Sequence, residues 1–452
     1  MERITIKKGH DIHMSGVPAK NIESASHPTV VAYQPEEFRY TKPKLLVQEG
    51  DSVKIGTPLF FDKCMPNVKW ASIGGGKISA IHYGYRRVIE KIIIELDKNE
   101  EAVEYTVFDH HEISDLSKTK VKDHLLATGL WPMIRQRPYS KIANPEDTPH
   151  SIFISCYNSA PLTVDLDVAL RNRSSSFQAG ITALSKLTDG NVHVVVDEKC
   201  TSNTFMDLKN TEIHMIRGPH PAGNVGIQIH HIDPLKPGKV VWTVNAQHVV
   251  TIGRLFLKGI FDPSLIISVG GSGVKNPTHL KSRIGASINT LTTDRLHDGP
   301  QRLISGDVLT GKTNDKNGFI HFYESTVSVI PHSDKRAFLG MLHPGSGKTH
   351  YSLTNTYFSF GANSFPFSTL SNGEGRAMMP INSWENVLPM DILPNQLYRA
   401  ILANDVEEME QLGLIECDEE DFALCSFACP SKIDVGSVIR QGLDVLEEEE
   451  KQ

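Results

Sequence analysis

The sequence is poor in the features that mark membrane spans, disulfide frameworks and nucleic-acid surfaces. Its longest apolar runs are strand-sized, whereas a membrane-spanning helix needs about 20 apolar residues. Six cysteines at irregular spacing among 452 residues favour a reducing compartment over a disulfide framework. The net charge of −7 comes from scattered acidic and basic residues, which argues against nucleic acid as the main partner.

The sequence also lacks an amino-terminal apolar signal region, internal repeats and low-complexity segments. We therefore expect a cytoplasmic protein that does not itself span the membrane. A chain of this length can bury several cores, and the usual size of domains favours three or four of them. The order of apolar patterns predicts an α/β multidomain protein.

The first region, residues 1–108, is rich in glycine, proline and short β-type runs. The phrases at 47–59 and 70–82 are typical of strands joined by glycine turns. Together they resemble the lipoyl/biotinyl carrier domain, a small flattened β-barrel. Lys63 falls near the position where such a carrier attaches its lipoyl group, but Met65, Pro66 and Asn67 broaden the turn. An ordinary exposed lysine is therefore favoured over a modified one.

The second region, residues 109–258, predicts a Rossmann-like α/β domain. Near-continuous apolar strands at 151–155 and 191–196 are separated by segments with helical periodicity, the order that forms a parallel sheet buried on both faces. A helix over 247–258 closes this region. A Gly-x-Gly-x-x-Gly fingerprint for dinucleotides is absent from it.

Residues 259–345 show short strands with one helix, which suggests a β-grasp module of the soluble ligand-binding type. Residues 346–452 are predicted to be mainly helical. Here Cys425 and Cys429 match the last two ligands of the ferredoxin pattern C-x2-C-x2-C-x3-C-P. The first two ligands would fall on Glu419 and Phe422. Two thiolates cannot hold a cluster alone, so the motif is a degenerate remnant and the cysteines are expected to be structural.

Two other motifs resemble a phosphate-binding loop and a metal site, but each departs from the pattern that such a site needs. Residues 344–349 read Pro-Gly-Ser-Gly-Lys-Thr, but Leu342 stands where a phosphate-binding loop needs glycine. His220, His230 and His231 lie within twelve residues without a Cys or carboxylate at ligand spacing. If the last two lie on a strand, they point to opposite faces. A polar turn and hydrogen-bonded histidines are favoured over phosphate and metal sites.

The segment 131–141 has the densest mixture of aromatic and cationic side chains in the chain. Arginine and lysine can donate hydrogen bonds to carbonyl or phosphate oxygens, while Trp, Met and Tyr offer an apolar wall. The same residue types are enriched where a loop is anchored in a subunit interface. The interface interpretation is slightly favoured on residues alone.

Taken in order, phrases along nearly the whole chain resemble the A subunit of the sodium-translocating NADH:quinone oxidoreductase family. They lie at 6–9, 47–56, 129–131, 137–141, 218–223, 242–247, 252–256, 390–394 and 424–430. The same order is also similar to two flavin-carrying relatives, the C subunit of the Rnf complex and the flavin subunit of respiratory complex I. The glycine-rich flavin loop of those relatives corresponds to 130–141, and their acidic segment to 156–161. Trp131, Pro132 and two arginines replace the glycines, and the carboxylates are gone.

The resemblance therefore implies a subunit without flavin, nicotinamide or iron–sulfur sites of its own. It implies a peripheral subunit on the cytoplasmic face of the bacterial inner membrane, in a complex that oxidises NADH, reduces ubiquinone and exports Na+. Flavins and the iron–sulfur centre would lie on partner subunits. This subunit would be associated with the quinone-reducing step.

A quinone is flat and has two carbonyl oxygens, so the quinone-binding candidates are Trp131, Arg135, Arg137, Tyr139 and Lys141. A purely structural docking subunit without substrate contact is the alternative. A third, a stand-alone carrier, would require a modification of Lys63.

Overall fold

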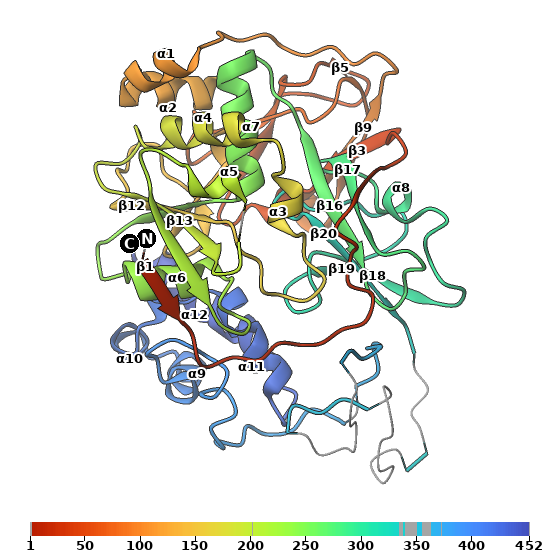
Figure 1. The fold of residues 1–452 in the computed structure, drawn as a ribbon, viewed down its shortest axis with the longest axis vertical. Coiled ribbons are helices and arrows are strands. Elements are labelled where there is room, and N and C mark those ends of the chain that lie inside the picture. Colours follow the sequence, from red (N-terminus) through yellow and green to blue (C-terminus); the bar gives the residue numbers. More distant parts are fainter. Residues whose placement is uncertain are drawn as a thin grey trace.

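The computed structural model describes residues 2–200, 202–333, 338, 339, 350–354, 363–371 and 373–451. Four β-sheets with associated helices are followed by a carboxy-terminal helical region (Figure 1). Within these residues, no helix is both long and apolar enough to cross a membrane. The chain thus has the mixed sheets and helices expected of an α/β multidomain protein.

The largest sheet has seven strands in the order β1-β14-β13-β12-β15-β10-β11. Strands β1, β14, β13, β12 and β15 run parallel, whereas β10 is antiparallel to both β15 and β11. The strands are β1 Glu2–Thr5, β10 Ile134–Arg137, β11 Lys141–Ile142, β12 Ser151–Ser155, β13 Val192–Asp197, β14 Glu212–Arg217 and β15 Val241–Val244.

Helices cover both faces of this sheet (Figure 1). On one side lie α1 His110–Asp115, α2 Lys118–Ala127, α4 Ser174–Leu184 and α7 Ala246–Lys258, and on the other lies α6 Val225–Ile232. The short helices α3 Leu166–Ala169 and α5 Asn203–Met206 follow β12 and β13. Helix α7 begins where the Asn245 side chain accepts from Gln247 N and ends at Gly259 in the left-handed conformation, as expected from capping preferences.

The second sheet has six strands in the order β19-β18-β20-β16-β17-β2. Their bounds are β2 Ile22–Ser24, β16 Ser264–Gly270, β17 Thr278–Arg283, β18 Gln301–Ser305, β19 Lys312–Asn314 and β20 Thr326–Pro331, with α8 Ile288–Thr292 between β17 and β18. The amino-terminal strand β2 pairs in parallel with β17.

Two smaller sheets form the β-rich amino-terminal part. One has the order β3-β9-β8-β5, and the other β4-β6-β7. The strands are β3 Val30–Tyr33, β4 Pro43–Leu45, β5 Ser52–Val53, β6 Pro58–Asp62, β7 Lys69–Ala71, β8 Gly76–Tyr83 and β9 Ile89–Leu96. Lys63 is exposed in the turn between β6 and β7.

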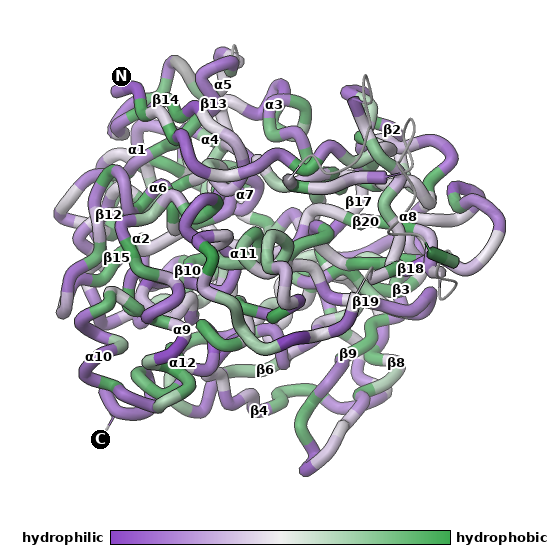
Figure 2. Tube along the Cα trace, turned by 90° about the horizontal axis from the view of Figure 1, so that it is seen from below, coloured by the Kyte–Doolittle hydropathy of each residue, from purple (hydrophilic) through white to green (hydrophobic). Residues whose placement is uncertain are grey.

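The carboxy-terminal helical region consists of α9 Pro394–Ala403, α10 Val406–Gln411, α11 Ala423–Ala428 and α12 Val435–Glu449. A 3-10 turn, Glu419–Phe422, leads into α11. Seen from below, this region lies against the seven-stranded sheet near β10 (Figure 2). Contacts with α6 and β10 therefore fix its position.

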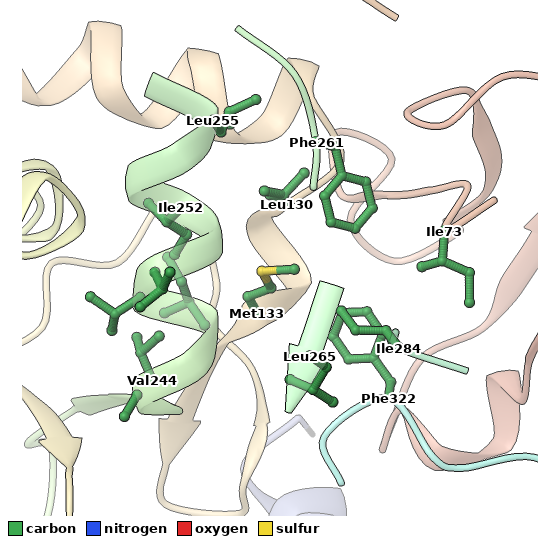
Figure 3. Close-up of a cluster of buried hydrophobic side chains, with 14 of the residues drawn as sticks. Ile73, Leu130, Met133, Val244, Ile252, Leu255, Phe261, Leu265, Ile284 and Phe322 are labelled. Atoms are coloured by element: carbon green, nitrogen blue, oxygen red, sulfur yellow. The ribbon is translucent and has the colours of Figure 1, made fainter. Parts of the chain in front are cut away.

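One hydrophobic core joins the β-rich part, the seven-stranded sheet and the six-stranded sheet. Figure 3 shows where they meet. Ile252 and Leu255 of α7 lie on one side of the cluster, Met133 and Leu265 of β16 lie in its middle, and Ile73 lies on the side away from α7. These side chains are at most 2% exposed. The regions are consequently packed against one another around a shared core.

Several details differ from the sequence-based expectations. The predicted region 1–108 contains β1 and β2, which pair within the other two large sheets. His230 and His231 lie in the last turn of α6 rather than on a strand, because the apolar run that precedes them is helical. The motif at 344–349 lies outside the described residues.

Candidate functional site

A cavity of about 200 Å³ lies at the carboxyl ends of the parallel strands β12 and β15. Ligands of open α/β sheets usually bind at this edge. Ser155 and Val244 end the two strands at the cavity, and residues 323–326, which lead into β20, form an opposite wall. Glu420 of the carboxy-terminal region closes it. Three parts of the chain thus meet around one enclosed space.

Arg135 of β10 lines this cavity and also an adjoining one of about 210 Å³. Its guanidinium carbon lies 4.7 Å from the centre of the Tyr323 ring. The Tyr323 hydroxyl donates to Pro132 O at 2.7 Å, which fixes the ring beneath the cation. Among the described residues, no carboxylate forms an ion pair with Arg135. Its donors are therefore available to a ligand with acceptor oxygens.

His220 also lines this cavity. Its Nδ1 lies 3.0 Å from the Ser159 hydroxyl, which already accepts from Gly223 N at 2.8 Å. The Ser159 hydroxyl can donate to Nδ1, and in that arrangement the neutral imidazole carries its proton on Nε2. Nε2 is buried and has no hydrogen-bond partner in the part of the chain that the structure describes. Burial lowers the pKa of His220 to about 4, so the ring is neutral near pH 7.

Two carboxyl groups border these cavities. Burial raises the pKa of Glu324 to about 8, with nearby Asp307 adding to the rise. Burial likewise raises the pKa of Glu37 to about 8, although its carboxylate accepts from Phe322 N at 2.7 Å. Both side chains are therefore protonated at neutral pH and can release protons beside the cavity.

Because the pKa values of Glu37 and Glu324 are raised, we expect the stability of the chain to depend on pH. Their pKa in the unfolded chain is about 4.3, so the folded state alone keeps the protons up to about pH 8. The free energy of unfolding therefore falls as the pH rises from about 4.3 to about 8. Each carboxyl contributes a loss of up to about 1.4 kcal/mol per pH unit. Partial exposure to the cavity makes the measured slope smaller.

We expect the substitution Glu324→Gln to flatten this slope and to stabilise the chain at pH 8 relative to the unchanged protein. Urea unfolding at pH 5 and pH 8 measures the effect. Glu448→Gln is the matched control, because Glu448 is exposed on α12. An unchanged slope in Glu324→Gln would show that this carboxyl ionises normally.

Of the five residues predicted to bind quinone, only Arg135 lines these two cavities. Trp131 is fully buried, and its Nε1 donates to Ala143 O at 2.7 Å. Tyr139 is 2% exposed, and Arg440 of α12 donates to its backbone oxygen at 3.1 Å. Lys141 pairs with Glu447 of α12 at 2.9 Å.

Arg137 is also directed toward the carboxy-terminal region. Its guanidinium lies 2.6 Å from Glu420, 3.2 Å from Asp418 and 3.5 Å from Asp421. Arg137, Asp418 and Asp421 are all at most 3% exposed. The cations around Asp418, Arg137 foremost, lower its pKa despite its burial. The segment thus anchors the carboxy-terminal region through ion pairs within the chain.

The remnant of the cluster motif is filled by protein contacts. Phe422 is fully buried, and Glu419 forms ion pairs with Arg39 and Arg440. Cys425 and Cys429 are buried, and burial raises the pKa of the Cys425 thiol. The two positions that would complete a ferredoxin ligand set therefore carry a core side chain and a salt-bridge partner.

The histidines considered as metal ligands have separate partners. His230 Nδ1 lies 2.8 Å from Glu416, and His231 Nε2 lies 2.9 Å from Pro389 O, whereas His220 faces Ser159. Sequence reasoning missed His220, Tyr323 and Glu324 as cavity residues. The rigid Gly-Pro-His-Pro phrase was a signal for His220, but residues 323 and 324 carry no recognisable motif.

Comparison with known proteins gives collinear matches along the chain. Three family profiles match: the NqrA N-terminal barrel-sandwich hybrid domain at 4–97, the NqrA second alpha/beta domain at 116–261 and the NQRA C-terminal domain at 266–316. Proteins described as the A subunit of the Na(+)-translocating NADH-quinone reductase are 40% identical over 452 residues in Yersinia pestis bv. Antiqua (strain Angola) and 38% over 448 in Pasteurella multocida (strain Pm70). Each alignment covers 99% of this chain and 100% of the relative.

The relative from Haemophilus influenzae (strain ATCC 51907 / DSM 11121 / KW20 / Rd) is 39% identical over 448 residues, with the same coverage. Among solved structures, an NAD+-reducing [NiFe]-hydrogenase chain in the H2-reduced state aligns with 12% identity and a TM-score of 0.33. It covers 41% of this chain and 41% of that chain, which is too little for an argument from structure.

Proposed function

The chain belongs to the NqrA family, the A subunits of the Na+-translocating NADH-quinone reductases, and from that premise we propose that it helps its complex to bind the quinone that is reduced. As one component of this translocase, it has the other subunits of the complex as partners. The complex oxidises NADH, reduces ubiquinone and exports Na+. This subunit sits peripherally on the cytoplasmic face of the inner membrane.

The observation that carries the proposal is the cation of Arg135, which lines the cavity without an ion-pair partner among the described residues. His220 lines the same cavity, and its buried Nε2 has no hydrogen-bond partner in the described part of the chain. A quinone has two carbonyl oxygens on a flat ring, and both accept more strongly as the ring is reduced. Reduction to the quinol also takes up two protons. Glu324 lines this cavity and Glu37 the adjoining one, and both keep their protons at neutral pH.

The test is the quinone dependence of the assembled complex with Arg135→Gln. Loss of the charged donor must raise the Michaelis constant for ubiquinone while NADH oxidation by an artificial acceptor is unchanged. A purely structural docking subunit is the second candidate, supported by the contacts that hold Arg137, Tyr139 and Lys141 against the carboxy-terminal region. That candidate predicts no change in the Michaelis constant.

The same premise supports finer assignments of the fold. The sheets β3-β9-β8-β5 and β4-β6-β7 are assigned as a carrier-like flattened barrel, the seven-stranded sheet as Rossmann-like and the six-stranded sheet as a β-grasp module. We assign no lipoyl function to Lys63, because the only feature that suggests one is its place in an exposed turn.

We also propose that the subunit contributes no flavin or iron–sulfur centre, and that Cys425 and Cys429 are structural. Changing both to alanine is expected to cost about 1–3 kcal/mol of stability, because buried cysteine acts as a small hydrophobic side chain. Urea unfolding of the chain and turnover of the complex measure the two effects separately. Normal stability with a complex that no longer turns over would contradict the proposal, as would a stoichiometric visible chromophore in the purified unchanged chain.

A further inference from the structure

A second group of potential ligands lies at the opposite edge of the seven-stranded sheet, away from the Arg135 cavity. His193 is the second residue of β13, and Glu212 and His214 are the first and third of β14. In the parallel pairing of these strands, His193 is opposite Glu212, and Val195 is opposite His214. Because side chains alternate along a strand, all three project from the same face of the sheet.

The three ligand atoms form a compact triangle. His193 Nδ1 lies 3.0 Å from His214 Nε2 and 3.4 Å from Glu212 Oε2, and the latter two atoms are 3.9 Å apart. A point equidistant from atoms at these spacings lies about 2 Å from each, which is the bond length of zinc to imidazole nitrogen or carboxylate oxygen. The triangle therefore accepts a metal ion without a large movement of the backbone.

The surroundings hold the ligands in orientation. His193 and His214 are 6% and 5% exposed, and the His193 ring packs against Phe153 with centroids 4.6 Å apart. Asn191 donates to the other oxygen of Glu212 at 2.8 Å, so Oε2 is left for the imidazoles. Glu212 itself is exposed, which leaves the position accessible from solvent.

A second carboxylate, that of Glu2, lies behind the group. Glu2 Oε2 of β1 lies 3.4 Å from His214 Nδ1, the nitrogen on the far side of the imidazole from the triangle. Such a carboxylate behind a metal-bound histidine fixes its tautomer and orientation.

We propose that His193, Glu212 and His214 bind a divalent transition-metal ion, for which Zn2+ is the best match, with a fourth position open to water. Two imidazoles and one carboxylate with an open position form a tetrahedral zinc set. The ion would join β13 to β14 and, through Glu2, to the amino-terminal strand β1. It is remote from the proposed quinone cavity and does not depend on the function proposed for that cavity.

The test is a Co2+ titration of the full, untagged chain after treatment with a chelator. Tetrahedral Co2+ absorbs strongly in the visible, whereas octahedral Co2+ is pale, so the spectrum reports geometry as well as binding. We expect one equivalent to give the tetrahedral spectrum and one equivalent of Zn2+ to abolish it. Removing the ligand with Glu212→Gln is expected to weaken binding by at least about tenfold, and Glu2→Gln by about tenfold.

Glu198→Gln is the matched control, since Glu198 pairs with Arg217 at the other end of the same strands. It should bind as the unchanged chain does. A thiolate-to-cobalt charge-transfer band would mean that the ion sits on cysteine and would overturn the proposal. So would a pale octahedral spectrum, no binding at millimolar Co2+, or equal affinity in Glu212→Gln and Glu198→Gln. The hydrogen-bonded histidine pair would then be purely structural.

Discussion

Replacing Arg137 by alanine is expected to destabilise the chain by about 3–5 kcal/mol, because it removes the buried cation that pairs with the carboxylates of Asp418 and Glu420. Asp418 and Asp421 are 3% and 0% exposed, and both lie within 3.5 Å of the Arg137 guanidinium. Arg39 and Arg440 still pair with Asp418, and burial raises the pKa of Asp421 to about 8, so the loss falls mainly on the ion pairs of Asp418 and Glu420. Urea unfolding gives the size of the loss.

The loss should be concentrated in the carboxy-terminal region, since Arg137 joins β10 to the turn before α11. Limited proteolysis is therefore expected to cut the Arg137→Ala chain first beyond residue 393. Arg135→Ala is the control from the same strand, because no described carboxylate pairs with it. Equal destabilisation by the two substitutions would mean that the ion pairs to 418–421 do not hold the region in place.

Replacing Arg135 by glutamine is expected to raise the Michaelis constant for ubiquinone by about ten- to hundredfold. A charged donor to an acceptor contributes about 1.5–3 kcal/mol, which corresponds to that range. The side chain packs on Tyr323 rather than in an ion pair, so little stability should be lost. Steady-state kinetics of the assembled complex with ubiquinone and with an artificial acceptor separate quinone binding from NADH oxidation.

A parallel loss of both activities would instead indicate that the subunit has detached or been distorted. Lys118→Gln is a suitable control because Lys118 lies at the start of α2 and, among the described residues, its ammonium donates only to the exposed Thr148 hydroxyl. Its kinetics should match those of the unchanged complex. An unchanged Michaelis constant in Arg135→Gln would favour the docking function without substrate contact.

Local pattern was enough to predict some of the regular elements of the α/β region, although not α6, whose His230 and His231 were considered on a strand. The apolar run at 151–155 forms β12 as expected, and the predicted helix 247–258 is observed as Ala246–Lys258. Both follow from residues next to one another in the chain, through apolar pattern and capping. Strands β1 and β2 could not be assigned to their sheets in this way, since their partners are more than 200 residues away.

The candidate site was predictable only in part for the same reason. Segment 131–141 was singled out for its aromatic and cationic side chains, and in the structure those side chains point to different parts of the molecule. Arg135 faces the cavity, and Arg137, two positions along the same strand, meets an acidic turn some 280 residues later. The acidic run 418–421 was visible in the sequence, yet nothing local pairs it with an arginine in β10. His220 was visible as well, whereas the Ser159 contact that orients it is a tertiary one.

Equilibrium binding of a short-chain, water-soluble ubiquinone to the purified chain is the most direct test of a quinone site at the Arg135 cavity. We predict saturable binding to one site, weakened about ten- to hundredfold by Arg135→Gln. Lys118→Gln should bind as the unchanged chain does. Absence of saturable binding to the chain, both alone and within the assembled complex, or equal affinity in the unchanged and Arg135→Gln proteins, would contradict a quinone site at the Arg135 cavity.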